Sequence, residues 1–239
     1  MKKILFLLLT FSNLTMTIAQ NSGVNNTHLA DSLLEQLNSG NDDFTIITEL
    51  YKDDPNLSED SINKLFKISN ENYFKNNLVR DKELEMQFRS ISLSDQLYRI
   101  RCYFHRSIEY SVVQKNDSAL QVRFLTLVNE HNNLSLTDRS FYQQTFQLLL
   151  IHSVATPKTH FFENNFHRYS SGLFNDFKKF TDLQIMLDMY LKFKYNKQFF
   201  NTEAGKGILP DHSFGLLPKI TDTDFKKVLS ELKVENAIY

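Results

Sequence analysis

The residues best suited to chemistry lie in the stretch SLSDQLYRIRCYFHRS, residues 92–107. It holds the carboxylate of Asp95, the guanidinium of Arg99 and the only cysteine of the chain, Cys102. On a helix these three side chains share one face, opposite an apolar stripe. The simplest interpretation is a solvent-exposed i,i+4 ion pair, worth only about 0.2–0.5 kcal/mol. The alternative is a buried polar network, which requires other elements to cover this helix on both sides.

His152 is the second candidate, at the end of the apolar segment FYQQTFQLLLIHS. It shares a helix face with Phe141 and Leu148, so we expect a buried, neutral imidazole with one donating and one accepting nitrogen. A catalytic role is the competing interpretation. His152 would then act as a general base oriented by a carboxylate, and Arg99 would hold an anionic group. The catalytic candidates are therefore His152, Asp95 and Arg99.

The sequence contains no complete motif for a metal or a cofactor. Glu163 with His167, and Cys102 with His105, have helical ligand spacing, but a zinc site needs three or four ligands. The chain lacks an HExxH motif, a CxxC motif, a phosphate-binding P-loop and the GxSxG turn of hydrolases. We therefore expect no metal site and no cofactor.

A segment without clear periodicity covers residues 196–219. Loops of this length inside a compact domain are usually functional or disordered. This loop carries seven large apolar residues, which favours an ordered segment that packs back over the helices. Packing it there would bring Gln198, Thr202 and His212 close to His152.

The spacing of apolar residues predicts helices along most of the chain. Gly and Pro are scarce, with 6 and 4 in all, which favours helices over many short strands. Two patterns come first: an apolar stripe from Leu29 to Leu37 that ends at Gly40, and a second stripe from Ile62 with Ser58 as its N-cap. Further helices are expected at about 92–114, 117–131, 137–154, 160–179, 181–195 and 222–235. The prediction is an all-α, single-domain, irregular multi-helix bundle with a long C-terminal loop before the last helix.

The N-terminal residues MKKILFLLLTFSNLTMTIAQ have the layout of a secretory signal peptide. Two lysines precede a short apolar core, and Ala19 ends a small-residue cleavage site. We expect a signal peptide over 1–19, a disordered lead-in over 20–28 and one helical domain over 29–239. The protein would be exported, either periplasmic or secreted.

Composition narrows the choice of partners. Removing residues 1–19 takes two lysines away, so the net charge changes from −1 to −3, which does not favour nucleic acid as a partner. No long apolar run follows the signal segment, so we expect no membrane span. With one cysteine, the domain must be held together by packing, for which it has 21 Phe and 10 Tyr.

Part of this pattern resembles the signature of a family of uncharacterised bacterial proteins, many of them exported. Residues 95–99, Asp-Gln-Leu-Tyr-Arg, match its DQ-x-x-R motif. Members continue with an Asp that begins a helix, here Asp117, and a hydrophobic run that ends in His, here His152. An Asp then precedes a Q-x-Y-G-T motif by ten residues. In this chain Asp188 precedes the corresponding segment, Gln198-Phe199-Phe200-Asn201-Thr202, by the same interval.

The chain also departs from the family pattern. Met189 replaces the Arg that usually follows the Asp, and a Gly-Trp-Pro turn is missing near Asn132. The usual Arg of the last helix is not evident either. Asn201 stands in the place of Gly, but Asn is the best other residue for a left-handed turn. If the family has an active site, these departures imply that this member has lost part of it.

The resemblance implies a polar cluster held between helices, but no activity, because none is assigned to the family. A network that sets helix register and a functional site both stay open as interpretations. Our first hypothesis is a non-enzymatic exported domain that binds a small ligand or a protein partner through this cluster, covered by the aromatic-rich loop. Our second hypothesis is a hydrolase- or transferase-like enzyme. The ligand-binding candidates are Gln96, Arg99, His152, Asp188, Gln198 and Thr202.

Overall fold

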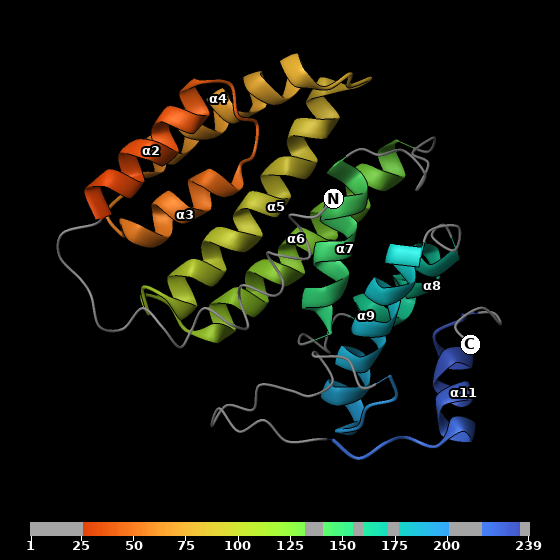
Figure 1. Cartoon of the computed structure of the whole chain (residues 1–239). Coiled ribbons are helices and arrows are strands. Elements are labelled where there is room, and N and C mark those ends of the chain that lie inside the picture. The colour runs from red at the N-terminus through yellow and green to blue at the C-terminus, as the bar shows by residue number, and fades with distance from the viewer. Residues whose placement is uncertain (1–25, 132–140, 155–159, 172–176, 201–216, 235–239) are drawn as a thin grey trace. The chain divides into compact units, whose positions relative to one another are not determined.

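The computed structural model describes residues 26–131, 141–154, 160–171, 177–200 and 217–234 (Figure 1). Within these residues the regular secondary structure is nine α-helices, with one isolated bridge between Gln198 and Lys219. The all-α prediction is therefore confirmed. The chain divides into two compact units, Met1–Tyr73 and Phe74–Tyr239, which we describe separately. A single domain over 29–239 stays a prediction.

The first unit contains α2 (Asn26–Asn38), α3 (Thr45–Asp53) and most of α4 (Glu59–Asn76). Its core is formed by three buried residues with partly buried neighbours around them: Leu37, Ile46 and Leu50. Asn72 on α4 joins the helices, because its side-chain amide donates to two backbone carbonyls, that of Leu37 near the end of α2 at 2.7 Å and that of Asn41 in the α2–α3 connection at 3.0 Å.

The helix signals in this unit act as expected. Gly40 follows α2 with φ 102°, a left-handed conformation that glycine adopts without strain. The Ser58 hydroxyl accepts a hydrogen bond from the Ser61 backbone at 3.2 Å, so the predicted N-cap of α4 is confirmed. One boundary differs, because α2 begins at Asn26 and so includes the last residues of the lead-in expected over 20–28.

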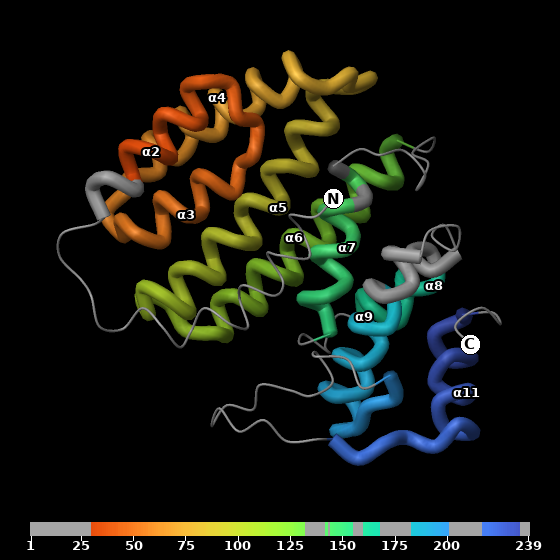
Figure 2. Tube along the Cα trace, in the orientation of Figure 1, coloured from red at the N-terminus to blue at the C-terminus, as the bar shows by residue number. Residues whose placement is uncertain are grey.

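The second unit contains the remaining helices: α5 (Lys82–Tyr103), α6 (Tyr110–Glu130), α7 (Phe141–Ser153), α8 (Phe161–Ser171), α9 (Phe177–Tyr195) and α11 (Asp222–Glu231). α5 packs against α6 and α7, and α7 also packs against α6, α8 and α9. The tube in Figure 2 shows the tight reversal that makes α5 and α6 an antiparallel pair. α5 and α7 are thus brought side by side although a complete helix separates them in the sequence.

Aromatic rings fill the space between these helices. Phe124 of α6 lies 5.5 Å, centroid to centroid, from both Phe88 of α5 and Phe146 of α7. Phe162 of α8 lies 4.8 Å from Tyr190 of α9 in a stacked arrangement. Such pairs add about 0.5–1.5 kcal/mol to the burial of the rings themselves. The high aromatic content of the sequence predicted a core held together by packing. In the second unit, these aromatic contacts form part of that core.

The predicted helix over 92–114 is wrong at both ends. The helix begins at Lys82, where the Asp81 carboxylate caps it by accepting from the Leu84 backbone, and it ends at Tyr103. Arg106 follows with φ 51°, a left-handed conformation that reverses the chain. The apolar period continues through this turn, so periodicity alone did not locate the break.

Two other predicted breaks fall inside helices. Asp117 was expected to begin a helix, but it lies within α6. The polar pair Lys115-Asn116, which was interpreted as a break, belongs to the helix, and Lys115 is exposed there. The step Phe180-Thr181 lies within α9. It contains neither Gly nor Pro, so nothing in it forces the helix to end. The start of the last helix was correct, because Thr221 accepts from the Asp224 backbone at 3.1 Å and caps α11, but the helix ends at Glu231 and not at 235.

None of the described helices combines the length and the apolar character that a membrane crossing requires. The expected signal segment, residues 1–19, lies outside the described residues.

Candidate functional site

Helix α5 is buried on several sides, which decides between the two interpretations of its polar residues. Asp95 is 0% exposed and Arg99 is 6% exposed. Ile91, Leu93 and Ile100 of the same helix are buried as well. The solvent-exposed pair favoured by the helical wheel is therefore wrong. A wheel assumes that only one face of a helix is covered, whereas α5 contacts both α6 and α7.

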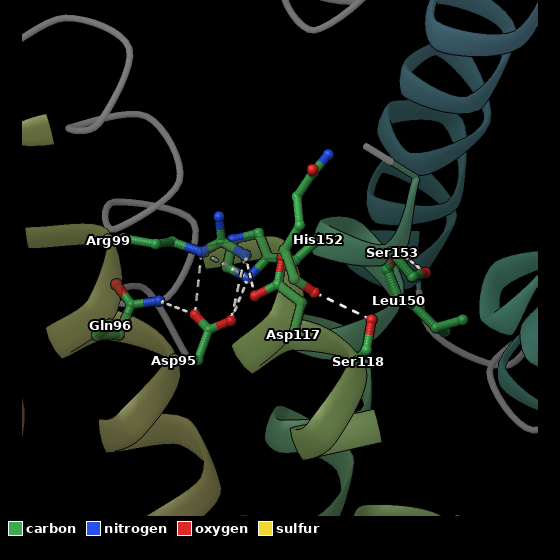
Figure 3. A network of polar contacts seen from close by, with 9 residues as sticks. Asp95, Gln96, Arg99, Asp117, Ser118, Leu150, His152 and Ser153 are labelled. Carbon is green, nitrogen blue, oxygen red and sulfur yellow. Dashed lines mark hydrogen bonds and ion pairs between the residues drawn. The ribbon is translucent and has the colours of Figure 1, made fainter. Parts of the chain in front are cut away.

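Three helices contribute to the cluster. Asp95, Gln96 and Arg99 come from α5, Asp117 comes from α6 and His152 comes from the last turn of α7. Figure 3 shows the side chains of Asp95, Arg99, Asp117 and His152 directed toward one another. We call Asp95, Gln96, Arg99, Asp117 and His152 the charged cluster.

Asp95 is the centre of the charged cluster. Its Oδ2 accepts from the Gln96 side-chain amide at 2.7 Å and from Arg99 Nε at 3.3 Å. Its Oδ1 lies 2.8 Å from His152 Nδ1 and accepts from Arg99 Nη2 at 3.3 Å. A buried carboxylate is tolerated only when such partners replace the water that it loses.

Arg99 joins two carboxylates. Its Nη2 also donates to Asp117 Oδ1 at 2.9 Å, so Asp117 and Asp95 share one guanidinium. Nε and Nη2 are thus both engaged. Among the described residues, no partner is found for the third nitrogen, Nη1. That nitrogen carries two N–H donors.

Burial and charge act in opposite directions on the two carboxylates. Burial raises the pKa of Asp95, but the nearby charges of Arg99 and His152 outweigh it and lower that pKa to about 2. For Asp117, burial outweighs the attraction of Arg99, and the negative charge of Asp95 adds to it, so the pKa of Asp117 is raised. The pKa of Arg99 is raised above its usual value by Asp95 and Asp117, which outweigh its burial. Asp95 and Arg99 are therefore both ionised near neutral pH.

The contact between Asp95 and His152 determines the tautomer of the imidazole. An ionised carboxylate can only accept, so a 2.8 Å contact from Nδ1 to Oδ1 requires the proton on Nδ1. Arg99 Nε also lies 3.1 Å from His152 Nδ1, but a protonated nitrogen cannot accept from it, so its hydrogen bond goes to Asp95 Oδ2. A neutral His152 then carries its lone pair on Nε2. This is the arrangement in which a carboxylate orients a general base.

A layer of neutral hydrogen bonds holds α7 against α5 beside the cluster. The hydroxyls of Ser92 and Thr145 lie 2.8 Å apart, and Thr145 also donates to the Phe88 carbonyl at 3.1 Å. Ser92 is one turn before Gln96 on α5, and Thr145 is two turns before His152 on α7. These bonds limit sliding of the two helices and so help to position His152 opposite Asp95.

Asp188 and Gln198 have contacts of a different kind. Asp188 Oδ1 accepts from the backbone nitrogens of Phe199 and Phe200 at 2.8 and 3.0 Å. Gln198 donates through its side-chain amide to the Leu217 carbonyl at 2.7 Å. Both residues therefore hold the two ends of the 196–219 loop in place, and a ligand-binding role for them stays a prediction.

Most of that loop, including Thr202 and His212, lies outside the described residues. The predicted closure of this loop over His152 therefore also lies outside the described residues. Its two described ends are joined by backbone hydrogen bonds, from Gln198 to the Pro218 carbonyl at 3.1 Å and from Ile220 to the Gln198 carbonyl at 3.0 Å.

Sequence reasoning missed two features of the site. Asp117 was predicted only to begin a helix, and its role as the second carboxylate on Arg99 depends on α6 folding back along α5. Gln121 was not singled out. It lies one turn after Asp117 and is 2% exposed, and both polar atoms of its side chain lack a hydrogen-bond partner within the described parts of the chain. Asp117 and Gln121 share an i,i+4 spacing on one face of α6, and that spacing is visible in the sequence.

In the part of the chain that the structure describes, no group of three or more His, Cys, Asp or Glu side chains could hold a metal ion. The groups that the charged cluster itself offers to a ligand are the N–H donors of Arg99 and the imidazole of His152.

We compared the chain with family models, with curated proteins and with solved structures, and none of the three comparisons yields a match.

Proposed function

We propose that this chain is an exported helical protein that binds a small anionic ligand at Arg99, beside His152. The observation that carries the proposal is the asymmetric use of the guanidinium. Nε and Nη2 are held by Asp95 and Asp117, while Nη1 has no partner among the described residues. A guanidinium held rigidly on one edge loses little side-chain entropy when its other edge binds a ligand.

The charge of Arg99 supports an anionic ligand. Arg99 is ionised near neutral pH, so the two N–H groups of Nη1 would donate charge-assisted hydrogen bonds to an anion.

The test uses acetate, inorganic phosphate and sulfate as probes in calorimetric titrations of the purified protein. We expect at least one probe to bind with a dissociation constant of about 1 mM or lower, which corresponds to about 4 kcal/mol. Arg99→Lys keeps the positive charge between the two carboxylates but removes the forked donor, so binding should weaken at least tenfold. The matched control is Arg101→Lys on the same helix, which should bind as the wild type does. Failure of every probe to bind the wild type at 10 mM would refute the proposal.

A general-base enzyme is the second candidate, and the 2.8 Å contact between Asp95 and His152 favours it. In this candidate His152 Nε2 takes the proton of a water molecule that attacks an ester or a phosphoester bound at Arg99. A nitrophenyl ester and a nitrophenyl phosphate are suitable substrates, because release of nitrophenol is coloured. Turnover that His152→Gln abolishes, while the anion probes still bind, would identify an enzyme. Binding of the anion probes without turnover of either substrate would identify a binding protein and contradict the enzyme.

Export and family membership form part of the same proposal. Signal-peptide cleavage after Ala19 predicts that protein recovered from the cell envelope or the medium begins at Gln20, which an intact-mass measurement checks. Recovery of full-length protein from the cytoplasm would contradict export. Membership of the DQ-x-x-R family stays a prediction.

A further inference from the structure

Two exposed tyrosines face each other where α5 ends and α6 begins. Tyr103 is 52% exposed and Tyr110 is 37% exposed. Their ring centroids lie 6.3 Å apart with a tilt of 39°, within the range of an attractive aromatic pair. Tyrosine rings exposed in pairs are typical of binding surfaces, because they offer a large contact area at a small cost in side-chain entropy.

Helical geometry places this pair next to the charged cluster. Tyr103 lies one turn after Arg99 on α5, so both side chains share one face of that helix. Tyr110 lies seven residues, about two turns, before Asp117 on α6 and also shares its face. Since α5 and α6 are antiparallel, the two tyrosines continue the cluster toward the turn end of the hairpin.

Electrostatics agrees with this placement. Burial raises the pKa of Tyr103 to about 12 and also raises the pKa of Tyr110. The positive charge of Arg99 lowers both pKa values but is outweighed by burial. Both hydroxyls are therefore neutral at physiological pH, and their rings do not repel an anion that approaches Arg99.

We propose that Tyr103 and Tyr110 form a second subsite that receives a planar ring, so that the ligand held at Arg99 Nη1 is a small aromatic carboxylate. This inference rests on the proposed function, since it extends the Arg99 site. Arg99 would recognise the carboxylate through charge-assisted hydrogen bonds. The two tyrosine rings would contact the apolar part of the ligand, where offset or edge contacts between aromatic rings are favourable.

Benzoate and acetate are the probes that separate the two subsites, because they share a carboxylate and differ by the ring. Calorimetric titration of the purified protein should give a dissociation constant for benzoate at least tenfold lower than that for acetate. In Tyr103→Leu and Tyr110→Leu this ratio should fall to threefold or less, while acetate affinity stays within twofold of the wild type. Tyr103→Phe, which retains the ring, should preserve the ratio.

Tyr98→Leu is the matched control. Tyr98 lies on the same helix, but its ring lies beneath Arg101, with 5.6 Å from the guanidinium carbon to the ring centroid. This variant should keep the full benzoate preference.

The remaining outcomes contradict the inference in two distinguishable ways. Equal affinities for benzoate and acetate, or a preference that survives both leucine substitutions, would overturn the aromatic subsite and leave anion binding at Arg99 intact. Absence of binding by both carboxylates, together with absence of phosphate and sulfate binding, would overturn the proposed function and this inference together.

Discussion

Asp95 Oδ1 on α5 lies 2.8 Å from His152 Nδ1 on α7, although the two residues are 57 positions apart in the chain. This contact joins the two helices at the level of the charged cluster, and the bond between Ser92 and Thr145 joins them again nearby. A buried carboxylate that exchanges hydrogen bonds with an imidazole and a guanidinium tolerates little change in helix register. The same contact therefore supports the fold of the second unit and orients the one imidazole that the proposed function uses.

Removing Arg99 should destabilise the protein strongly. Arg99→Ala leaves Asp95 and Asp117 buried without their shared cation, and breaking a buried pair on one side costs about 3–5 kcal/mol. Urea unfolding followed by circular dichroism measures this loss. Arg101→Ala on the same helix is the control and should lose less than about 1 kcal/mol. A loss below 1 kcal/mol for Arg99→Ala would mean that Arg99 does not stabilise the buried carboxylates.

The stability of the protein should depend on Asp95 in acid. Its pKa is lowered to about 2 in the folded state, against 3.8 for an ordinary Asp. A lowered pKa stabilises the folded state above the unfolded value, and this contribution is lost as the pH falls from 3.8 toward 2. The difference in unfolding free energy between wild type and Asp95→Asn should shrink by about 2 kcal/mol over this window. An unchanged difference would contradict the lowered pKa.

Asp117 should show the opposite dependence, because its pKa is raised in the folded state. A group with a raised pKa contributes its full stability below the unfolded value and loses it as the pH rises through the folded value. The advantage of wild type over Asp117→Asn should therefore decrease as the pH rises above about 4, measured by the same urea titrations. Parallel slopes for the Asp95 and Asp117 variants would show that the two carboxylates do not differ in this way.

Gln121 offers a test of an unpaired buried amide. Gln121→Met removes both polar atoms with little change of volume, so the unfolding free energy should rise by about 1–2 kcal/mol. Gln96→Met is the matched control, because the Gln96 amide donates to Asp95 at 2.7 Å and its loss should destabilise. Thermal melting of both variants provides the comparison. Destabilisation by both substitutions would reveal a partner for Gln121, such as a buried water molecule or the ligand.

Asp188 should hold the turn that follows α9. Asp188→Ala leaves the backbone amides of Phe199 and Phe200 without their acceptor, and each buried unpaired group costs about 1–3 kcal/mol. Their amide protons should exchange faster in this variant, which hydrogen-exchange NMR measures. Asp188→Asn retains an acceptor oxygen and should protect both amides to an intermediate degree. Wild-type exchange rates in Asp188→Ala would show that other contacts hold the turn.

Helix content and helix ends with distinctive residues could be predicted from the sequence. The caps at Gly40, Ser58 and Thr221 are local, because each depends on the conformation or hydrogen bonding of residues within a few positions. The break at 104–109 could not be placed. It depends on Arg106 in a left-handed conformation, which a residue other than glycine adopts only where the surrounding structure supports it.

For the candidate site too, some features could be predicted from the sequence and others depended on the tertiary structure. Residue types, spacing and the family resemblance identified Asp95, Gln96, Arg99 and His152 as one set, because i,i+4 pairs and motif intervals are properties of the chain. Burial was not such a property. The helical wheel placed Asp95 and Arg99 on a solvent-exposed face, whereas the family resemblance implied a cluster held between helices. The packing of α6 and α7 against α5 decides for burial. Tertiary structure also added Asp117 to the site, since the second carboxylate reaches Arg99 only when α6 folds back along α5 and covers the guanidinium that both acids share.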